Sequence, residues 1–204
     1  MTSEKPRGIL FVLVGPGGTG KNTLMNAVMT QHDNLKQLAT ATTRKIRPNE
    51  KQGREHLFVS EARFREMIEN NKLLEHQEVT PGKFYGIPRA SVTDAIDTGE
   101  NLIADIEVLG AQILSENFSD DTMLIFVTVP GETLEERLTV LRERMTGRFD
   151  EHDQEADEER IQQRLKRARE LEFPFMDKCQ HVIVNDDMDK AIAELNKIVS
   201  NALQ

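Results

Sequence analysis

One segment of the sequence has the residue types and the spacing of a phosphate-binding loop. It comprises Gly15, Pro16, Gly17, Gly18, Thr19, Gly20, Lys21, Asn22 and Thr23. The segment fits the pattern G-x-x-x-x-G-K, in which successive backbone N–H groups point inward at an anion and the following helix adds its positive N-terminal end. The amine of Lys21 would then reach the β- and γ-phosphates of a nucleotide such as ATP.

The flanking sequence favours a nucleotide site over a glycine turn that binds nothing. Residues 8–14 (GILFVLV) are continuously apolar and rich in β-branched side chains, which is typical of a strand buried on both faces of a parallel sheet. A helix is expected at about 22–31. Strand, glycine-rich turn and helix are the context that the motif requires.

The residue after Lys21 departs from the pattern. A Ser or Thr usually stands there and contacts Mg²⁺ through its hydroxyl, whereas this chain has Asn22. An amide oxygen can still ligate a metal, and Thr23 is adjacent. Asn22 is therefore a weaker candidate for a metal ligand than Lys21 is for a phosphate ligand.

The composition bounds the class of protein. The chain has 204 residues, of which 38 % are hydrophobic and 30 % charged, so we expect one well-cored unit with room for a small lobe rather than a disordered chain. We expect no membrane span, since no run approaches about 20 apolar residues. We expect no signal peptide either, because the first apolar run ends in glycines. The formal net charge of -9 argues against binding of bulk nucleic acid.

Cys179 is the single cysteine of the sequence. It excludes an intramolecular disulfide and a cysteine-rich metal site, and it fits a reducing cytosol, so the expected location is cytoplasmic.

The remaining pattern alternates strands with helices, which predicts an α/β fold with a parallel sheet covered on both faces. Residues 123–130 form a second apolar strand, and Thr133 to Glu136 form a capping box that opens a helix. Residues 146–157 are polar and acidic and predict a loop. A charged helix is expected over 158–172, with Leu171 among its inward-facing residues.

Several further motifs, in order along nearly the whole chain, resemble those of guanylate kinases and their close nucleoside monophosphate kinase relatives. They are TTRKIRP (42–48), GREHLFVS (53–60), LLEH (73–76), FYGIPRASV (84–92), LIADIEVLGA (102–111), ERL (136–138), QQRLKRARE (162–170) and VIVNDDMDKA (182–191). The resemblance implies a P-loop three-layer α/β/α fold with a parallel core sheet. It also implies a core at 1–39, 91–130 and 174–204, an inserted GMP-binding lobe at 40–90 and a lid at 131–173.

The implied activity is Mg²⁺-dependent transfer of the γ-phosphoryl group of ATP to GMP. Such a reaction needs two anionic substrates held in line and the charge on the moving group neutralised. The family pattern assigns Arg137 and Arg164 of the lid to the phosphoryl group. The second lid arginine is ambiguous among Arg142, Arg144 and Arg148, because the lid carries an acidic insertion; Arg148 is favoured.

The resemblance also assigns the acceptor site. Arg44, Arg47 and Tyr85 would bind the monophosphate, Glu75 would accept from the guanine N1 and N2 hydrogens, and Thr40 would lie near guanine O6. Asp105 and Glu107 would lie near the acceptor and the metal water. Asn185 would lie near the adenine of ATP, although plain turn chemistry explains it equally well.

Two acceptor-site positions depart from the family pattern. His56 replaces a phosphate-binding tyrosine, and Ile87 replaces a Ser or Thr that helps to hold the base. These changes, with Asn22, also resemble ribose 1,5-bisphosphate phosphokinases, which leaves that activity as an alternative. A non-catalytic guanylate kinase-like interaction module is a third hypothesis, disfavoured by the presence of Lys21 and the lid arginines. The sequence leaves open whether the chain is a monomer or a homodimer.

Overall fold

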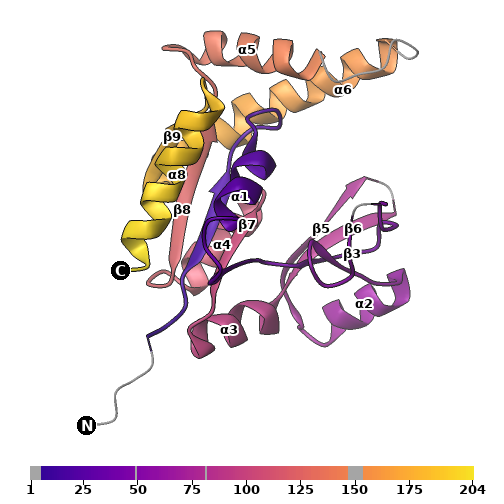
Figure 1. The fold of residues 1–204 in the computed structure, drawn as a ribbon. Helices are drawn as coiled ribbons and strands as arrows, with labels where there is room; N and C mark the ends of the chain where they lie inside the picture. Colours follow the sequence, from indigo (N-terminus) through magenta and orange to yellow (C-terminus); the bar gives the residue numbers. More distant parts are fainter. Residues whose placement is uncertain (1–5, 49, 81, 147–153) are drawn as a thin grey trace. The chain divides into compact units, whose positions relative to one another are not determined.

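The computed structural model describes residues 6–48, 50–80, 82–146 and 154–204 (Figure 1). By its internal contacts the chain divides into two compact units. The first holds the chain up to Val12, His32–Ala104 and Leu109–Met123. The second holds Leu13–Gln31, Asp105–Val108 and Leu124–Gln204.

A five-stranded sheet with the order β2-β7-β1-β8-β9 forms the core. Its strands are β1 (Leu10–Val14), β2 (Leu35–Gln37), β7 (Asn101–Asp105), β8 (Thr122–Thr128) and β9 (His181–Val184). Strand β2 runs parallel to β7, and β9 runs parallel to β8. All five residues of β1 are buried, as their apolar, β-branched composition predicts. The helices that accompany this sheet are α1 (Lys21–Met29), α3 (Arg89–Thr98), α4 (Val108–Asn117) and α8 (Met188–Ala202). The α/β fold with a parallel core sheet is confirmed.

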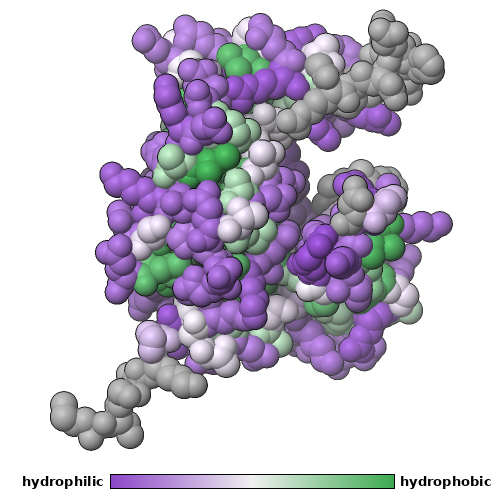
Figure 2. Space-filling model, in the orientation of Figure 1, coloured by the Kyte–Doolittle hydropathy of each residue, from purple (hydrophilic) through white to green (hydrophobic). Residues whose placement is uncertain are grey.

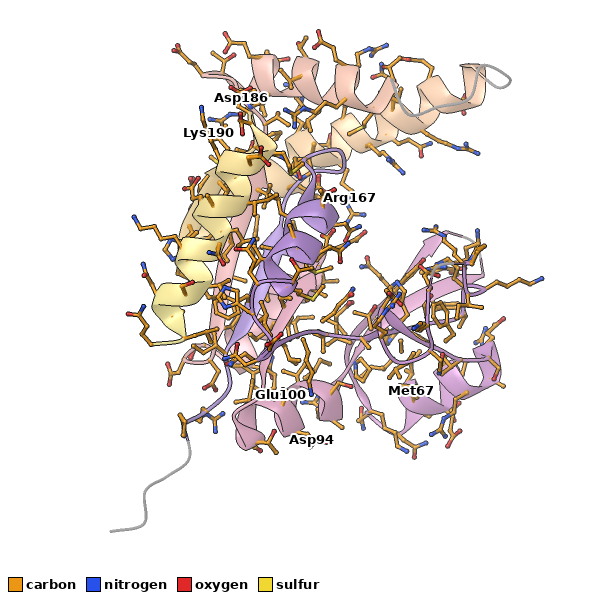
Figure 3. The ribbon with its side chains drawn as sticks, viewed as in Figure 1. Met67, Asp94, Glu100, Arg167, Asp186 and Lys190 are labelled. Carbon is orange, nitrogen blue, oxygen red and sulfur yellow. The ribbon has the colours of Figure 1, made fainter. Side chains whose placement is uncertain are left out.

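A second sheet lies within the first unit and has the order β4-β3-β6-β5. Its strands are β3 (Thr40–Thr42), β4 (His56–Phe58), β5 (Leu73–Thr80) and β6 (Lys83–Pro88). Helix α2 (Glu61–Glu69) packs on it through Phe64 and Met67, which join Ala41 and Leu73 in a separate small core (Figure 3). The Ser60 hydroxyl caps α2 by accepting from the Arg63 N–H at 3.2 Å, as the sequence predicts.

The second unit contains a helical pair, α5 (Leu134–Thr146) and α6 (Gln154–Arg167). The capping box at the start of α5 is confirmed. The Thr133 hydroxyl accepts from the Glu136 N–H, and the Glu136 carboxylate accepts from the Thr133 N–H, both at 3.3 Å. Two short helical turns follow, α7 (Phe173–Phe175) and a 3₁₀ turn at Met176–Lys178.

Helix α6 ends at Arg167 and does not continue as an α-helix through residue 172. Ala168–Glu172 is π-helical, so one extra residue enters the turn. The predicted inward position of Leu171 is therefore wrong: its side chain is 55 % exposed, while the Glu172 side chain is only 13 % exposed. The π turn breaks the 3.6-residue period on which the prediction rested.

Two strands and the start of one helix also differ from the sequence prediction. Strands β2 and β3 were not predicted, because each has three residues and carries polar side chains. Helix α6 begins at Gln154, inside the predicted 146–157 loop, of which residues 147–153 lie outside the described part. Strand β7 ends at Asp105, so Glu107 lies in the connection to α4.

The surface shown in Figure 2 is mostly hydrophilic, with apolar side chains in small separate groups. This agrees with a sequence in which 30 % of residues are charged. Among the described residues, no helix combines the length and the apolar character that crossing a bilayer requires.

Candidate functional site

The glycine-rich loop between β1 and α1 adopts a backbone that side chains disfavour. Gly15, Gly18 and Gly20 have φ angles of 139°, 95° and 91°. A Cβ atom on Gly15 would lie 2.2 Å from the Val127 carbonyl oxygen, so β8 also requires glycine there. The loop thus packs closely on the sheet, and its N–H groups lead into the N-terminus of α1, which is an anion-binding arrangement.

The amine of Lys21 is held at this loop. Its Nζ donates to the carbonyl oxygens of Gly15 at 2.6 Å and Pro16 at 3.1 Å, and it lies 3.7 Å from Asp105 Oδ1. The Lys21 side chain is only 10 % exposed. The charge is therefore concentrated next to the loop, where a phosphate would meet it.

Three carboxylates gather near this lysine. Burial raises the pKa of Asp105 and of Glu172, and the charge of Lys21 opposes the shift in both. Arg167 pairs with Glu107 and also lies 3.5 Å from Glu172 (Figure 3). Arg167 therefore links the π-helical turn to the β7–α4 connection.

Asn185 connects the phosphate loop to the end of β9. Its side-chain Nδ2 donates to the Thr19 carbonyl oxygen at 2.7 Å, and both residues are buried. Arg144 of α5 donates to the Asn185 carbonyl oxygen at 2.8 Å. These bonds give Asn185 a role in holding the loop, whereas its contact with adenine stays a prediction.

The arginines of the helical pair have different surroundings. Arg137 is half-buried, donates from Nε to the Gly131 carbonyl oxygen at 2.9 Å and lies over the Phe173 ring. Arg164 is exposed, with its NH1 3.9 Å from the position that a Cβ of Gly17 would take, so it extends toward the phosphate loop. Arg142 pairs with Glu158 of α6 at 2.6 Å. Arg148 lies outside the described residues.

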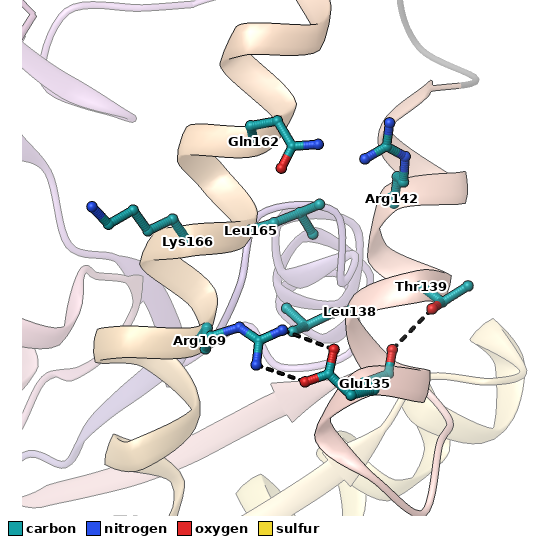
Figure 4. Close-up of a pocket in the computed structure, with 8 residues that line it drawn as sticks. All are labelled: Glu135, Leu138, Thr139, Arg142, Gln162, Leu165, Lys166 and Arg169. Atoms are coloured by element: carbon teal, nitrogen blue, oxygen red, sulfur yellow. Dashed lines mark hydrogen bonds and ion pairs between the residues drawn. The ribbon is translucent and has the colours of Figure 1, made fainter.

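A groove of about 320 Å³ runs between α5 and α6 (Figure 4). Arg169 pairs with both carboxylate oxygens of Glu135 across it, at 2.6 and 2.8 Å. The Thr139 hydroxyl donates to the Glu135 carbonyl oxygen. Because its principal charges are satisfied across the helix pair, this groove serves packing of the two helices.

In the first unit, Arg44 lies at the centre of a second polar group. Its NH1 and NH2 donate to the two carboxylate oxygens of Glu50 at 2.8 and 2.7 Å, and its Nε donates to the Tyr85 hydroxyl at 3.0 Å. The Arg44 guanidinium lowers the pKa of Glu50 to about 2. The Arg47 side chain is exposed, and its backbone N–H donates to Glu50 at 2.8 Å.

The same sheet carries the residues expected near the base. Thr40 Oγ1 and His56 Nδ1 are 2.8 Å apart. Glu75 is 9 % exposed and lies opposite Ile87 in the β5–β6 ladder, where Ile87 is buried. The structure therefore places the Glu75 carboxylate of β5 opposite the apolar Ile87 of β6. It also brings Thr40 of β3 into contact with His56 of β4.

Two residues with evident roles were missed by sequence reasoning. Glu50 fixes the Arg44 guanidinium, and its place three residues after Arg47 in a polar loop was the available signal. Glu172 lies close enough to Lys21 to be influenced by its charge, and it ends a π turn for which the sequence gives no signal.

The residues suited to Mg²⁺ are few. Asn22 and Thr23 are exposed at the start of α1, and Asp105 is about a quarter exposed. In the described ranges, no group of three or more His, Cys, Asp or Glu side chains could hold a metal ion. Mg²⁺ at a nucleotide is bound mainly by phosphates and water with one or two protein oxygens, so this donor set fits it.

Comparisons with known proteins point in one direction. The family model described as "Guanylate kinase" matches residues 7–202. A guanylate kinase of Trichodesmium erythraeum is 37 % identical over 192 residues, covering 94 % of this chain and 96 % of the relative. One of Salinibacter ruber is 38 % identical over 185 residues, covering 91 % and 92 %. The crystal structure of guanylate kinase from Anaplasma phagocytophilum superposes with a TM-score of 0.69 at 28 % identity, covering 98 % of this chain and 88 % of that one.

Proposed function

The chain belongs to the guanylate kinase family, and we propose that it transfers the γ-phosphoryl group of ATP to GMP, giving ADP and GDP. It is an ATP-dependent nucleoside monophosphate kinase. The observation that carries the proposal is the position of Lys21, whose amine is held against the carbonyl oxygens of a glycine-rich loop at the start of α1. A lysine amine beside a glycine-rich loop at a helix N-terminus is the arrangement by which a P-loop binds the phosphates of a nucleoside triphosphate.

On the donor side, the loop from Gly15 to Asn22 binds the phosphates of ATP and Lys21 neutralises their charge. Arg137 and Arg164 stabilise the charge that develops on the γ-phosphoryl group when the lid closes and excludes water. The exposed Arg164 guanidinium, directed toward Gly17, supports its part in this proposal. Arg148 stays a prediction for the third arginine.

On the acceptor side, Arg44, Arg47, His56 and Tyr85 bind the phosphate of GMP. Glu75 accepts from the N1 and N2 hydrogens of guanine, which adenine does not offer in that arrangement. No general base is assigned, because an oxygen of the monophosphate is already an anionic nucleophile.

Asn22 is the residue that would hold Mg²⁺, with ATP phosphates and water completing its shell. The ion supplies positive charge to the β- and γ-phosphate oxygens. Asp105 and Glu107 are the carboxylates proposed near the acceptor and the metal water. Asp105 lies 3.7 Å from the Lys21 amine, which supports a place beside the transferred group.

The two alternative functions are not favoured. The relatives are named as guanylate kinases over nearly the full length of the chain, which does not favour a ribose 1,5-bisphosphate phosphokinase. Lys21, Arg137 and Arg164 are all present, whereas a non-catalytic module has no use for them.

The test is release of ADP from Mg·ATP with GMP, dGMP, AMP, IMP and ribose 1,5-bisphosphate offered separately. Fast turnover with GMP, with or without dGMP, is the expected result. Preference for ribose 1,5-bisphosphate, or equal turnover with every base, would overturn the assignment of GMP as the acceptor.

A further inference from the structure

The acceptor sheet contains a pair of side chains whose contact is set by the backbone. Thr40 and His56 are register partners in the parallel β3–β4 ladder. Their side chains meet with Thr40 Oγ1 2.8 Å from His56 Nδ1. The pairing of two strands, and not a flexible loop, therefore brings the imidazole and the hydroxyl together.

The imidazole also packs beside the residues proposed to bind the phosphate. The His56 ring packs edge-on against Tyr85, with ring centroids 5.9 Å apart, and against Phe58 at 5.6 Å. The Tyr85 hydroxyl accepts from Arg44 Nε at 3.0 Å. Among the described residues, the side-chain hydrogen bond of the imidazole is made by Nδ1, which leaves Nε2 for a ligand held by Arg44 and Tyr85.

The charge state of the ring follows from its surroundings. Burial lowers the pKa of His56, and the charge of Arg44 lowers it further. The charges of Glu50 and Glu55 and a hydrogen bond with the Thr40 backbone act in the opposite direction without reversing the shift. The imidazole is therefore neutral at neutral pH and carries a single N–H, on either Nδ1 or Nε2.

We propose that Thr40 is a positioning residue that donates its hydroxyl hydrogen to His56 Nδ1 and so keeps the imidazole proton on Nε2, from which His56 donates to the phosphate of the acceptor. The inference rests on the proposed function and deepens it. A neutral ring with its proton on Nδ1 would present a lone pair to the phosphate oxygens and repel them. Because a hydroxyl has one hydrogen, Thr40 cannot donate to guanine O6 while it donates to His56.

The tautomer can be observed without any nucleotide. Long-range ¹H–¹⁵N correlation spectra of the full-length, ¹⁵N-labelled protein distinguish protonated from unprotonated imidazole nitrogens, and His56→Gln identifies the His56 signals. At neutral pH we expect Nε2 to be protonated and Nδ1 unprotonated. In Thr40→Val, which keeps the branched shape, we expect both tautomers to be populated. A proton on Nδ1, or an imidazolium ion, in the unsubstituted protein would overturn the proposal.

A double-mutant cycle tests the consequence for the acceptor. Thr40→Val should raise KM for GMP about threefold to tenfold with little change in kcat, since one hydrogen bond is weakened. The same substitution should have no further effect on KM in the His56→Gln background. An equal rise in both backgrounds would mean that Thr40 acts independently of His56, for example on the base, and would overturn the proposal. Thr93→Val on α3 is the matched control.

The measurements distinguish a wrong acceptor from a wrong role for Thr40. If GMP is not the acceptor, the unsubstituted protein will not turn it over, whatever its tautomer. If only the positioning role of Thr40 is wrong, GMP turnover will be normal and the spectra will show the other tautomer.

Discussion

The side-chain amide of Asn185 donates to the Thr19 carbonyl oxygen, joining the end of β9 to the phosphate loop across 166 residues of sequence. Asn185 is 3 % exposed and Thr19 is fully buried, so water does not compete for this bond. Arg144 donates to the backbone carbonyl of the same asparagine. The conformation of the loop thus depends on a residue that follows the last strand.

Replacing Asn185 should therefore damage ATP binding. In Asn185→Asp a carboxylate oxygen would face the Thr19 carbonyl oxygen, which costs about 1–3 kcal/mol when a buried group loses its partner. We expect a higher KM for ATP and an unchanged KM for GMP, measured by steady-state kinetics. Asp186→Asn, at the exposed neighbouring position (Figure 3), is the control. An equal rise in both KM values would show a general loss of structure instead.

Lys21→Met should abolish most turnover, because it removes the charge next to the phosphate loop. The Lys21 side chain is only 10 % exposed and makes two hydrogen bonds to the loop. We therefore expect a moderate loss of stability as well, about 1–3 kcal/mol, measured by urea denaturation. Lys190→Met on the exposed side of α8 should change neither property. Turnover within a few-fold of the unsubstituted enzyme would refute the role of Lys21.

Glu75→Gln should impair GMP selectively. The carboxylate is buried on β5 beside the apolar Ile87, and an amide that presents one acceptor and one donor cannot accept from both guanine hydrogens. We expect KM for GMP to rise about tenfold or more, with the Kd of ATP unchanged in calorimetry. Glu69→Gln, exposed on α2, is the control. An equal loss with every acceptor would argue against base recognition at this position.

The Arg44–Glu50 pair predicts a pH dependence of stability. The pKa of Glu50 is lowered from 4.5 to about 2, chiefly by its hydrogen bonds from Arg44. A lowered folded-state pKa gives stability that is present above pH 4.5 and is lost as the pH falls toward about 2. Urea denaturation should find Glu50→Gln less stable than the unsubstituted protein at neutral pH, with the difference vanishing near pH 2. A difference that stays constant over this range would contradict the ion pair.

Glu172 predicts the opposite dependence of stability on pH. Burial raises the pKa of Glu172 above 4.5. Protonated Glu172 therefore contributes a stability to the folded protein that is fully present below pH 4.5 and is lost as the pH rises through the raised pKa. Glu172→Gln should therefore be more stable than the unsubstituted protein at neutral pH, in thermal unfolding, and equal to it below pH 4.5. Glu170→Gln, exposed in the same turn, should show no such difference.

Local sequence determined the donor half of the site. The apolar strand β1, the three glycines with positive φ and the helix start at Lys21 all lie within a short stretch of chain, so pattern and spacing predicted them together. The caps at Ser60 and Thr133 were predicted for the same reason, since each bonds to an N–H three residues away.

The acceptor half depends on contacts that spacing does not reveal. Thr40 and His56 meet because β3 pairs with β4 in one particular register, and β3 itself is too short to predict from its pattern. Glu50 reaches Arg44 through a turn in a polar loop. Thr40, Arg44 and His56 were predicted as site residues by resemblance, whereas Glu50 was not. The contacts that these residues make needed the fold.

The π-helical segment Ala168–Glu172 also bears on how the chain tolerates changes in length. Because the turn holds one residue more than an α-helical turn, deleting a single residue there restores ordinary helical pairing and leaves the flanking turns in register. Leu171 is a suitable residue to delete, because it is already 55 % exposed. A one-residue deletion here should therefore be better tolerated than one inside α5 or α6, where it would rotate every following side chain by about 100°.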